Sequence, residues 1–255
     1  MKTIVKYMIL DLVRNKTVLV YAIVLAVLST SILGFDSNAS KGLLSLMNIT
    51  LLFVPIITIL FATIYFFNSI EFTELLLAQP VKRPMVLLAE YIGLASSLSL
   101  AYLTGIGLPL IIIAPSPASF TLIITGILLT LIFSAFALLI FVMFKDKTKG
   151  IGVAIITSLF FTILFDGLLM AFIYAFSDYP IEETVVGILS FSPIDLARVL
   201  MLLKLDVAVL MGYSGAVFKK FLGSSAGTIY SFSWLVVWVV LPLVLAIRIF
   251  KRKDL

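Results

Sequence analysis

The chain contains neither cysteine nor histidine. Without cysteine it can form no disulfide and offers no thiolate as nucleophile or ligand. Without histidine it lacks the side chain on which haem ligation, most zinc sites and Ser-His or Cys-His catalysis depend. We therefore expect no metal site and no catalytic residue, and we do not interpret the chain as an enzyme.

Charged residues are also scarce, at 12% of the sequence, whereas hydrophobic residues make up 62% and the mean hydropathy is +1.25. A soluble domain carries about 25% charged and about 45–50% apolar residues. The surplus of apolar side chains needs a second apolar medium, which a lipid bilayer supplies. The composition predicts an integral membrane protein.

Two further classes of protein are excluded by pattern. The chain has no Gly-x4-Gly-Lys-Ser/Thr motif, so it does not hold ATP in a phosphate-binding loop of its own. Its net charge of +5 is compatible with nucleic acid binding, but the basic residues lie at the borders of the apolar stretches, as membrane proteins place them. No nucleic acid partner is expected.

Six stretches are long and apolar enough to cross a bilayer, which takes about 20 residues. They are expected near Thr17–Phe35, Leu46–Ser69, Tyr91–Ile113, Phe120–Phe144, Ile151–Phe176 and Thr228–Phe250. No repeat or linker divides them. The sequence therefore predicts an all-α membrane protein with one transmembrane domain over residues 1–255.

Lysine and arginine indicate the orientation of the spans. Thirteen of the 18 basic residues lie within 1–16, 82–83, 145–149 and 248–253, which six spans place on one side of the membrane. Short loops rich in these residues stay in the cytoplasm. We expect both chain ends to be cytoplasmic, in an inner (cytoplasmic) membrane. An odd number of spans would spoil this distribution.

The first 16 residues mix apolar and basic side chains, unlike a cleavable signal peptide, which needs one apolar run and a small-residue cleavage site. Ile4, Tyr7, Met8 and Leu12 fall on one helical face by their three-to-four spacing. We expect a helix that lies at the inner membrane interface. An ordinary charged lead-in to the first span is the alternative.

The connection after the second span, residues 71–90, has its own pattern. The leucine run 75–77 favours a short helix, and Pro80 ends or kinks it. Pro84 suits the first turn of a second helix. A solvated loop has no need of three consecutive leucines, so this apolar face is expected to rest on lipid headgroups or a protein partner.

The connection before the sixth span, residues 177–227, is the one sizeable outer segment. Ser192 is placed to cap a helix, with Pro193 at its first position and Asp195 in its first turn. We expect one or two helices lying on or dipping into the outer leaflet, as a structural cap or as a docking surface. The glycines expected to punctuate the chain beyond them are Gly212, Gly215, Gly223 and Gly227.

Asp166 is the only acid expected deep within a span. A charge there costs at least a few kcal/mol, so Asp166 is either part of a transport pathway or bonded to a neighbouring hydroxyl or backbone group. The third span is rich in small residues, which allow close packing within the chain or along a dimer or pathway face. These residues are Gly93, Ser96, Ser97, Ser99, Gly105 and Gly107.

The order of these parts resembles the ABC-2 type transporter permeases, a type V exporter-like fold. The inner loop carries the resemblance with Glu74-Leu-Leu-Leu-Ala-Gln-Pro-Val-Lys-Arg-Pro, in which a leucine run meets Gln-Pro and a basic turn. The outer segment Ser192-Pro-Ile-Asp-Leu-Ala-Arg is similar to the branch of that family that serves nitrous oxide reductase maturation.

The resemblance implies partners. Such permeases are homodimers that work with two copies of a separate ABC ATPase, which binds the ATP and Mg. In the maturation branch the ATPase is NosF, and a periplasmic protein, NosD, completes a complex that supports assembly of the copper-sulfur centre. The resemblance assigns ATPase coupling to Glu71, Glu74, Leu75, Leu76, Gln79, Pro80, Lys82 and Arg83, and docking of the extracytoplasmic partner to Ser192, Pro193, Asp195 and Arg198.

One departure bears on the cargo. Without histidine, cysteine or aligned methionine or acid pairs, the chain offers poor ligands for a copper path. A sulfur species, or mechanical signalling to the outer partner, fits the sequence better. Two other functions stay open: a generic ABC-2 exporter of a drug, lipid or ion, and a membrane scaffold that transports nothing.

Overall fold

The computed structural model describes residues 2–35, 39–78, 82–176, 179, 182–205 and 212–252, and every regular element in these ranges is a helix. Six of the described helices are long and apolar enough to cross a membrane. The predicted all-α fold with six spans is confirmed. The spans are formed by α2 (Lys16–Phe35), α3 (Ala39–Asn68), α5 with α6 (Arg83–Tyr102 and Leu108–Ile113), α7 (Pro117–Met143), α8 with α9 (Lys147–Leu159 and Phe165–Ala175) and α12 (Gly212–Arg252).

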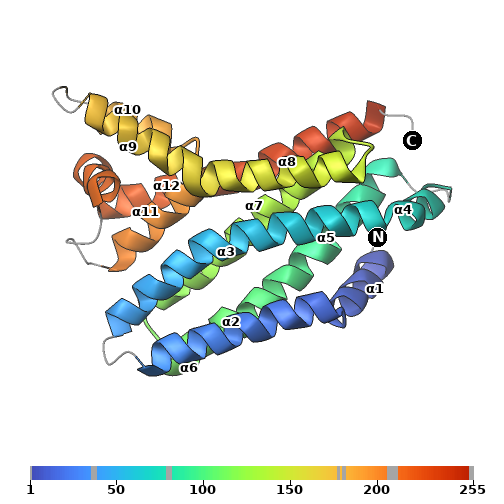
Figure 1. The fold of residues 1–255 in the computed structure, drawn as a ribbon, viewed down its shortest axis with the longest axis horizontal. Helices are drawn as coiled ribbons and strands as arrows, with labels where there is room; N and C mark the ends of the chain where they lie inside the picture. Colours follow the sequence, from blue (N-terminus) through green and yellow to red (C-terminus); the bar gives the residue numbers. More distant parts are fainter. Residues whose placement is uncertain are drawn as a thin grey trace.

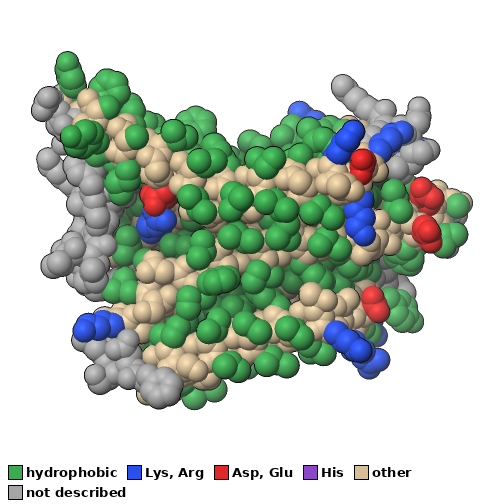
Figure 2. Space-filling model, in the orientation of Figure 1, with side chains coloured by type: hydrophobic (Ala, Val, Ile, Leu, Met, Phe, Trp, Pro, Cys, Tyr) green, Lys and Arg blue, Asp and Glu red, His purple; other side chains and the backbone are tan. Residues whose placement is uncertain are grey.

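The spans run side by side, and the two ends of the bundle differ (Figure 1). Both chain termini lie at the end that holds α4 (Ile70–Leu77), while α10 (Glu182–Leu189) and α11 (Pro193–Leu205) lie at the other end. Figure 2 shows that most of the visible charged side chains gather toward the two ends of the bundle. The surface between the ends is hydrophobic. This distribution is the one a bilayer requires.

Helix α7 occupies the centre of the bundle. Of the most apolar stretch of this helix, 72% is buried, and the helix packs on α3, α5, α11 and α12. In the span formed by α8 and α9, and in α12, only 17% of the most apolar stretch is buried. The two outermost spans therefore offer most of their apolar surface to lipid or to another copy of the chain.

The third span contains a π-helical turn, Leu103–Gly107, just before Pro109. Because Pro109 has no N–H, the carbonyl of Gly105 four residues earlier loses its helical donor. The hydroxyl of Ser29 in α2, which is fully buried, donates to that carbonyl at 2.7 Å. This bond joins the first and third spans. It stabilises their contact, because a carbonyl left unpaired in lipid costs several kcal/mol.

The small residues of the third span serve internal packing. A Cβ added at Gly105 would stand 2.6 Å from Leu25 Cβ and 2.9 Å from the backbone oxygen of Ala22, both in α2. One added at Gly93 would stand 2.8 Å from Met8 Cβ. Of the two alternatives for these glycines, packing within the chain is therefore correct, and a dimer or pathway face is not needed to explain them.

Helix α1 (Lys2–Val13) is separate from the first span. The side chain of Asn15 accepts a hydrogen bond from the backbone N–H of Thr17 at 2.9 Å and so caps α2. Met8 and Leu12 are buried, and α1 packs on α5. Tyr7 was expected on the same face but is 68% exposed. It precedes the buried Met8, and consecutive residues of a helix point in directions about 100° apart.

The expectation for the glycines before the sixth span was wrong. Helix α12 starts at Gly212 and runs for 41 residues through Gly215, Gly223 and Gly227. Glycine costs a helix about 1 kcal/mol relative to alanine, but it keeps its N–H and does not end the helix as proline does. At about 1.5 Å per residue this helix is roughly twice as long as one crossing needs.

The contact between α2 and Gly105 predicts the effect of one methyl group. Gly105→Ala should destabilise the protein by about 1–3 kcal/mol, because the backbone of α2 cannot move aside cheaply. Gly167→Ala is the control, since an added Cβ there meets nothing within 4 Å and alanine favours a helix. Thermal unfolding of the purified variants in detergent measures both, and equal unfolding temperatures would contradict the packing.

Candidate functional site

Helix α4 lies at the end of the bundle that holds both termini (Figure 1). It is amphipathic over its eight residues, with Thr73 and Leu76 buried. Leu75 is 69% exposed, and the carboxylates of Glu71 and Glu74 are exposed beside it. The helix therefore presents two large apolar side chains, Leu75 and Phe72, and two negative charges outward from a fixed inner face.

A buried polar contact attaches α4 to the third span. The hydroxyl of Thr73 donates to Glu90 Oε1 at 2.5 Å, and Glu90 is fully buried in α5. Thr73 Oγ1 also lies 3.0 Å from the backbone oxygen of Ser69. The sequence reasoning did not assign Thr73 or Glu90 to the site. Glu90 could have been recognised from the sequence, because a carboxylate one or two turns into a span needs a hydrogen-bond partner close by.

The turn between α4 and α5 carries the predicted basic pair. The N–H of Ala78 donates to the Glu74 carbonyl and ends α4. Lys82 is extended and exposed, and α5 begins at Arg83, also exposed, with Pro84 in its first turn as expected. Gln79 and Pro80 lie outside the described residues. The geometry fits a charged turn at the end of the bundle, and its role in ATPase coupling stays a prediction.

At the other end, α10 and α11 meet at a bend of 116°. Ser192 Oγ accepts a hydrogen bond from the N–H of Asp195 at 3.2 Å, so the predicted cap of α11 is confirmed. The sequence predicted one or two helices lying on or dipping into the outer leaflet, and α11 is the more deeply placed of the two. It packs on α12, α7 and α3, and it is buried almost all round, as a helix without a polar face should be.

Asp166 is paired with a residue of this outer segment. Arg198 Nη1 lies 3.0 Å from Asp166 Oδ1 and 2.9 Å from Asp195 Oδ1. The expected hydroxyl or backbone partner for Asp166 was wrong, because a guanidinium 32 residues further on reaches it. The triad joins the fifth span to α11.

The triad is only partly accessible. The Asp195 side chain is 2% exposed, whereas those of Arg198 and Asp166 are 26% and 34% exposed. Burial raises the pKa of the Asp195 carboxyl above its ordinary value, and the Arg198 guanidinium opposes that rise. Asp166 and Arg198 are thus partly exposed on the described structure, and behind them the buried Asp195 holds the guanidinium in place.

Among the residues expected to dock an outer partner, Ser192, Pro193 and Asp195 are buried within the chain. They build the start of α11 and leave little surface of their own. Phe191, in contrast, is 69% exposed at the bend. Trp238 Nε1 of α12 donates to the Ser190 carbonyl at 3.0 Å and fixes this bend to the sixth span.

Comparison with known proteins adds independent information. No protein-family profile matches the chain. A protein of Pseudomonas aeruginosa named "Probable ABC transporter permease protein NosY" is 27% identical, over 99% of this chain and 98% of the relative. A protein of the same name from Stutzerimonas stutzeri is 26% identical, over 95% of each chain.

The chain is similar to NosY permeases over nearly its full length. The similarity to NosY includes the region of α4 and the outer segment, so it is not confined to the apolar spans. The resemblance to ABC transporter permeases stated from the sequence is thereby confirmed. Together with the six apolar spans, it supports a multi-pass inner-membrane protein that resembles transporter permeases.

The triad predicts the effect of removing its cation. Arg198→Gln should lower stability by about 1–3 kcal/mol, because it leaves Asp166 and the buried Asp195 without a charged partner. Adding Asp166→Asn and Asp195→Asn to the same chain should restore part of the loss. Thermal unfolding in detergent measures the three chains, and an Arg198→Gln variant as stable as the parent would refute the pairing.

Proposed function

We propose that this chain is the membrane-spanning subunit of a NosY-like ABC transporter, driven from the cytoplasm by a separate ATPase subunit that binds the ATP and Mg. The proposal rests chiefly on one combination. The chain is similar to NosY permeases from end to end, and it carries an anchored helix with an exposed leucine at the end of the bundle rich in lysine and arginine.

The input lies at α4 and the turn that follows. Leu75 and the carboxylates of Glu71 and Glu74 are the exposed groups that a groove of the ATPase can hold, and Lys82 and Arg83 add positive charge beside them. The excess of basic residues at this end supports a cytoplasmic location for both termini. Leu76, buried at 9% exposure, transfers the position of α4 to the bundle rather than contacting the partner.

Hydrogen bonds connect α4 to the centre of the bundle. Thr73 bonds to Glu90 of α5, and the neighbouring Tyr91 hydroxyl donates to the Leu131 carbonyl of α7 at 3.1 Å. Tyr102, further along α5, donates to the Leu122 carbonyl of α7 at 3.2 Å. Since α7 packs on α11, a displacement of α4 has a continuous set of contacts through which to reach the outer end.

The output is proposed at α10, α11 and the bend between them. There the chain would act on a periplasmic, NosD-like partner, as a homodimer, in assembly of the copper-sulfur centre of nitrous oxide reductase. Phe191 is the exposed apolar side chain for that contact, and Arg198 with Asp166 is the partly exposed charge pair on a candidate cargo path. A sulfur species or mechanical coupling fits this chain better than copper, since it has no histidine or cysteine.

Isolation of the complex from the native host separates the proposal from its alternatives. A permease that purifies with both an ATPase and a periplasmic protein supports the NosY-like function. An ATPase without a periplasmic protein favours a generic exporter of a drug, lipid or ion. A permease that purifies with no ATPase overturns the proposal and favours a scaffold.

Two adjacent leucines provide a matched test of coupling. Leu75→Ala should leave stability unchanged within about 0.5 kcal/mol but weaken ATPase binding about tenfold, because it removes an exposed apolar contact. Leu76→Ala should instead destabilise the chain by about 2–5 kcal/mol, because it opens a cavity under α4. Thermal unfolding and titration of the ATPase onto the purified permease measure the two effects, and full ATPase affinity in Leu75→Ala would remove α4 from the interface.

A further inference from the structure

A cavity of about 480 Å³ opens between α1, the end of α3 and α4. Its volume falls within the range of about 300–1,000 Å³ that small-molecule sites occupy. It borders α4 but includes none of the residues assigned to ATPase coupling. Its walls are formed by Tyr7, Met8, Asp11, Asn15, Tyr65, Asn68, Ser69 and Phe72.

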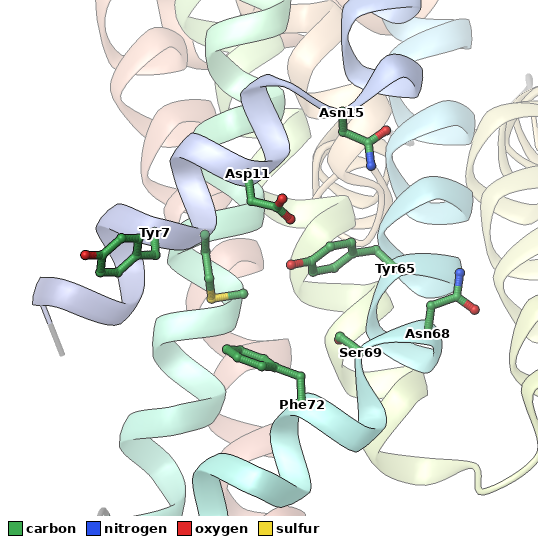
Figure 3. A pocket seen from close by; sticks show the side chains of 8 residues that line it. Tyr7, Asp11, Asn15, Tyr65, Asn68, Ser69 and Phe72 are labelled. Carbon is green, nitrogen blue, oxygen red and sulfur yellow. The ribbon is translucent and has the colours of Figure 1, made fainter.

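The walls combine one carboxylate with aromatic rings. Figure 3 shows the Asp11 carboxylate and the Tyr65 hydroxyl directed toward the same space, with the Phe72 ring beside it and the Tyr7 ring pointing away. Neither lysine nor arginine lines the cavity, and both ion pairs found among the described residues lie at Arg198. A carboxylate next to aromatic faces attracts a cation, and an ammonium group above all.

The one cation bonded to a lining residue does not enter this space. Lys147 Nζ donates to Asn68 Oδ1 at 2.7 Å, and Figure 3 shows the Asn68 side chain directed away from Asp11 and Tyr65. The charge that faces the space beside Tyr65 and Phe72 is therefore the Asp11 carboxylate. A ligand that ends in an ammonium group matches it.

The surroundings of the cavity indicate where such a ligand comes from. Exposed apolar side chains flank it on two helices: Tyr7 and Leu10 of α1 are 68% and 48% exposed, and Phe72 of α4 is 44% exposed. Helices α1 and α4 lie at the end of the bundle that the distribution of basic residues predicts to be the inner interface (Figure 1). Side chains of this kind contact lipid, so the ligand reaches the cavity from the bilayer.

We propose that this cavity binds the headgroup of an inner-leaflet phosphatidylethanolamine, with its ammonium at Asp11, Tyr65 and Phe72. The lipid joins α1 to α3 and α4 and so steadies the base of α4. The assignment rests on the cavity itself and is independent of the proposed transport function.

Native mass spectrometry of the full-length protein, released from nanodiscs with equal amounts of phosphatidylethanolamine and phosphatidylglycerol, tests the assignment. The parent chain should retain one phosphatidylethanolamine per chain. Asp11→Asn and Phe72→Leu should each lower that retention about tenfold, as loss of a charge-assisted contact does. Glu183→Gln and Phe232→Leu are the matched controls, because both side chains are exposed elsewhere, and they should retain the lipid fully.

The opposite results are equally clear. Equal retention of the two lipids, or undiminished retention in both Asp11→Asn and Phe72→Leu, overturns the proposal. A further arm adds free ethanolamine to nanodiscs of phosphatidylglycerol alone. Binding of ethanolamine there, with the same dependence on Asp11, would assign the cavity to a soluble amine and overturn the lipid as its ligand.

Discussion

A backbone N–H or C=O that faces lipid has no water to bond with, and the described structure of this chain depends on that constraint. The chain meets it with helices that satisfy their own backbone groups. Where the constraint is broken, a neighbour repairs it. Pro109 deprives the Gly105 carbonyl of its donor, and Ser29 of another span supplies one from 2.7 Å away. Because that repair needs close approach, position 105 has to be glycine.

The same constraint separates the functions of the bundle in space. The buried carboxylates that join the end helices to the spans have partners, as at Thr73–Glu90 and at the Arg198 triad. Exposed charge is free to collect at the two ends, where proteins outside the membrane can reach it. A transporter driven by a separate ATPase needs this division, with an input at one end, an output at the other and a well-packed centre between them.

Short-range features of the fold were predictable from sequence. The six spans follow from composition, and the cap of α11 follows from Ser192 and Pro193, because each depends on residues close together in the chain. The pairing of Asp166 with Arg198 was not predictable, because it joins residues 32 apart on different helices. The burial of Ser192 and Asp195 was missed for the same reason, since α11 is covered by α7 and α12. The early start of α12 was missed because glycine weakens a helix without ending it.

Two kinds of structural information therefore changed the candidate site. Exposure divided the predicted coupling residues into those that can touch a partner, such as Leu75, and those that hold the helix, such as Leu76. Tertiary contact added Thr73 and Glu90, and burial of Ser192 moved the proposed outer docking surface toward Phe191 and α10. Both changes preserve a permease with its drive and its output at opposite ends.

Labelling of single cysteines in whole cells tests that arrangement most directly, because the natural chain has no cysteine of its own. In Leu75→Cys the thiol should react with an impermeant maleimide only after the membrane is opened, and the ATPase should protect it. In Thr184→Cys, in exposed α10, it should react in intact cells. Labelling of Leu75→Cys from outside, or its full reactivity in the presence of bound ATPase, would contradict a permease driven from the cytoplasm through α4.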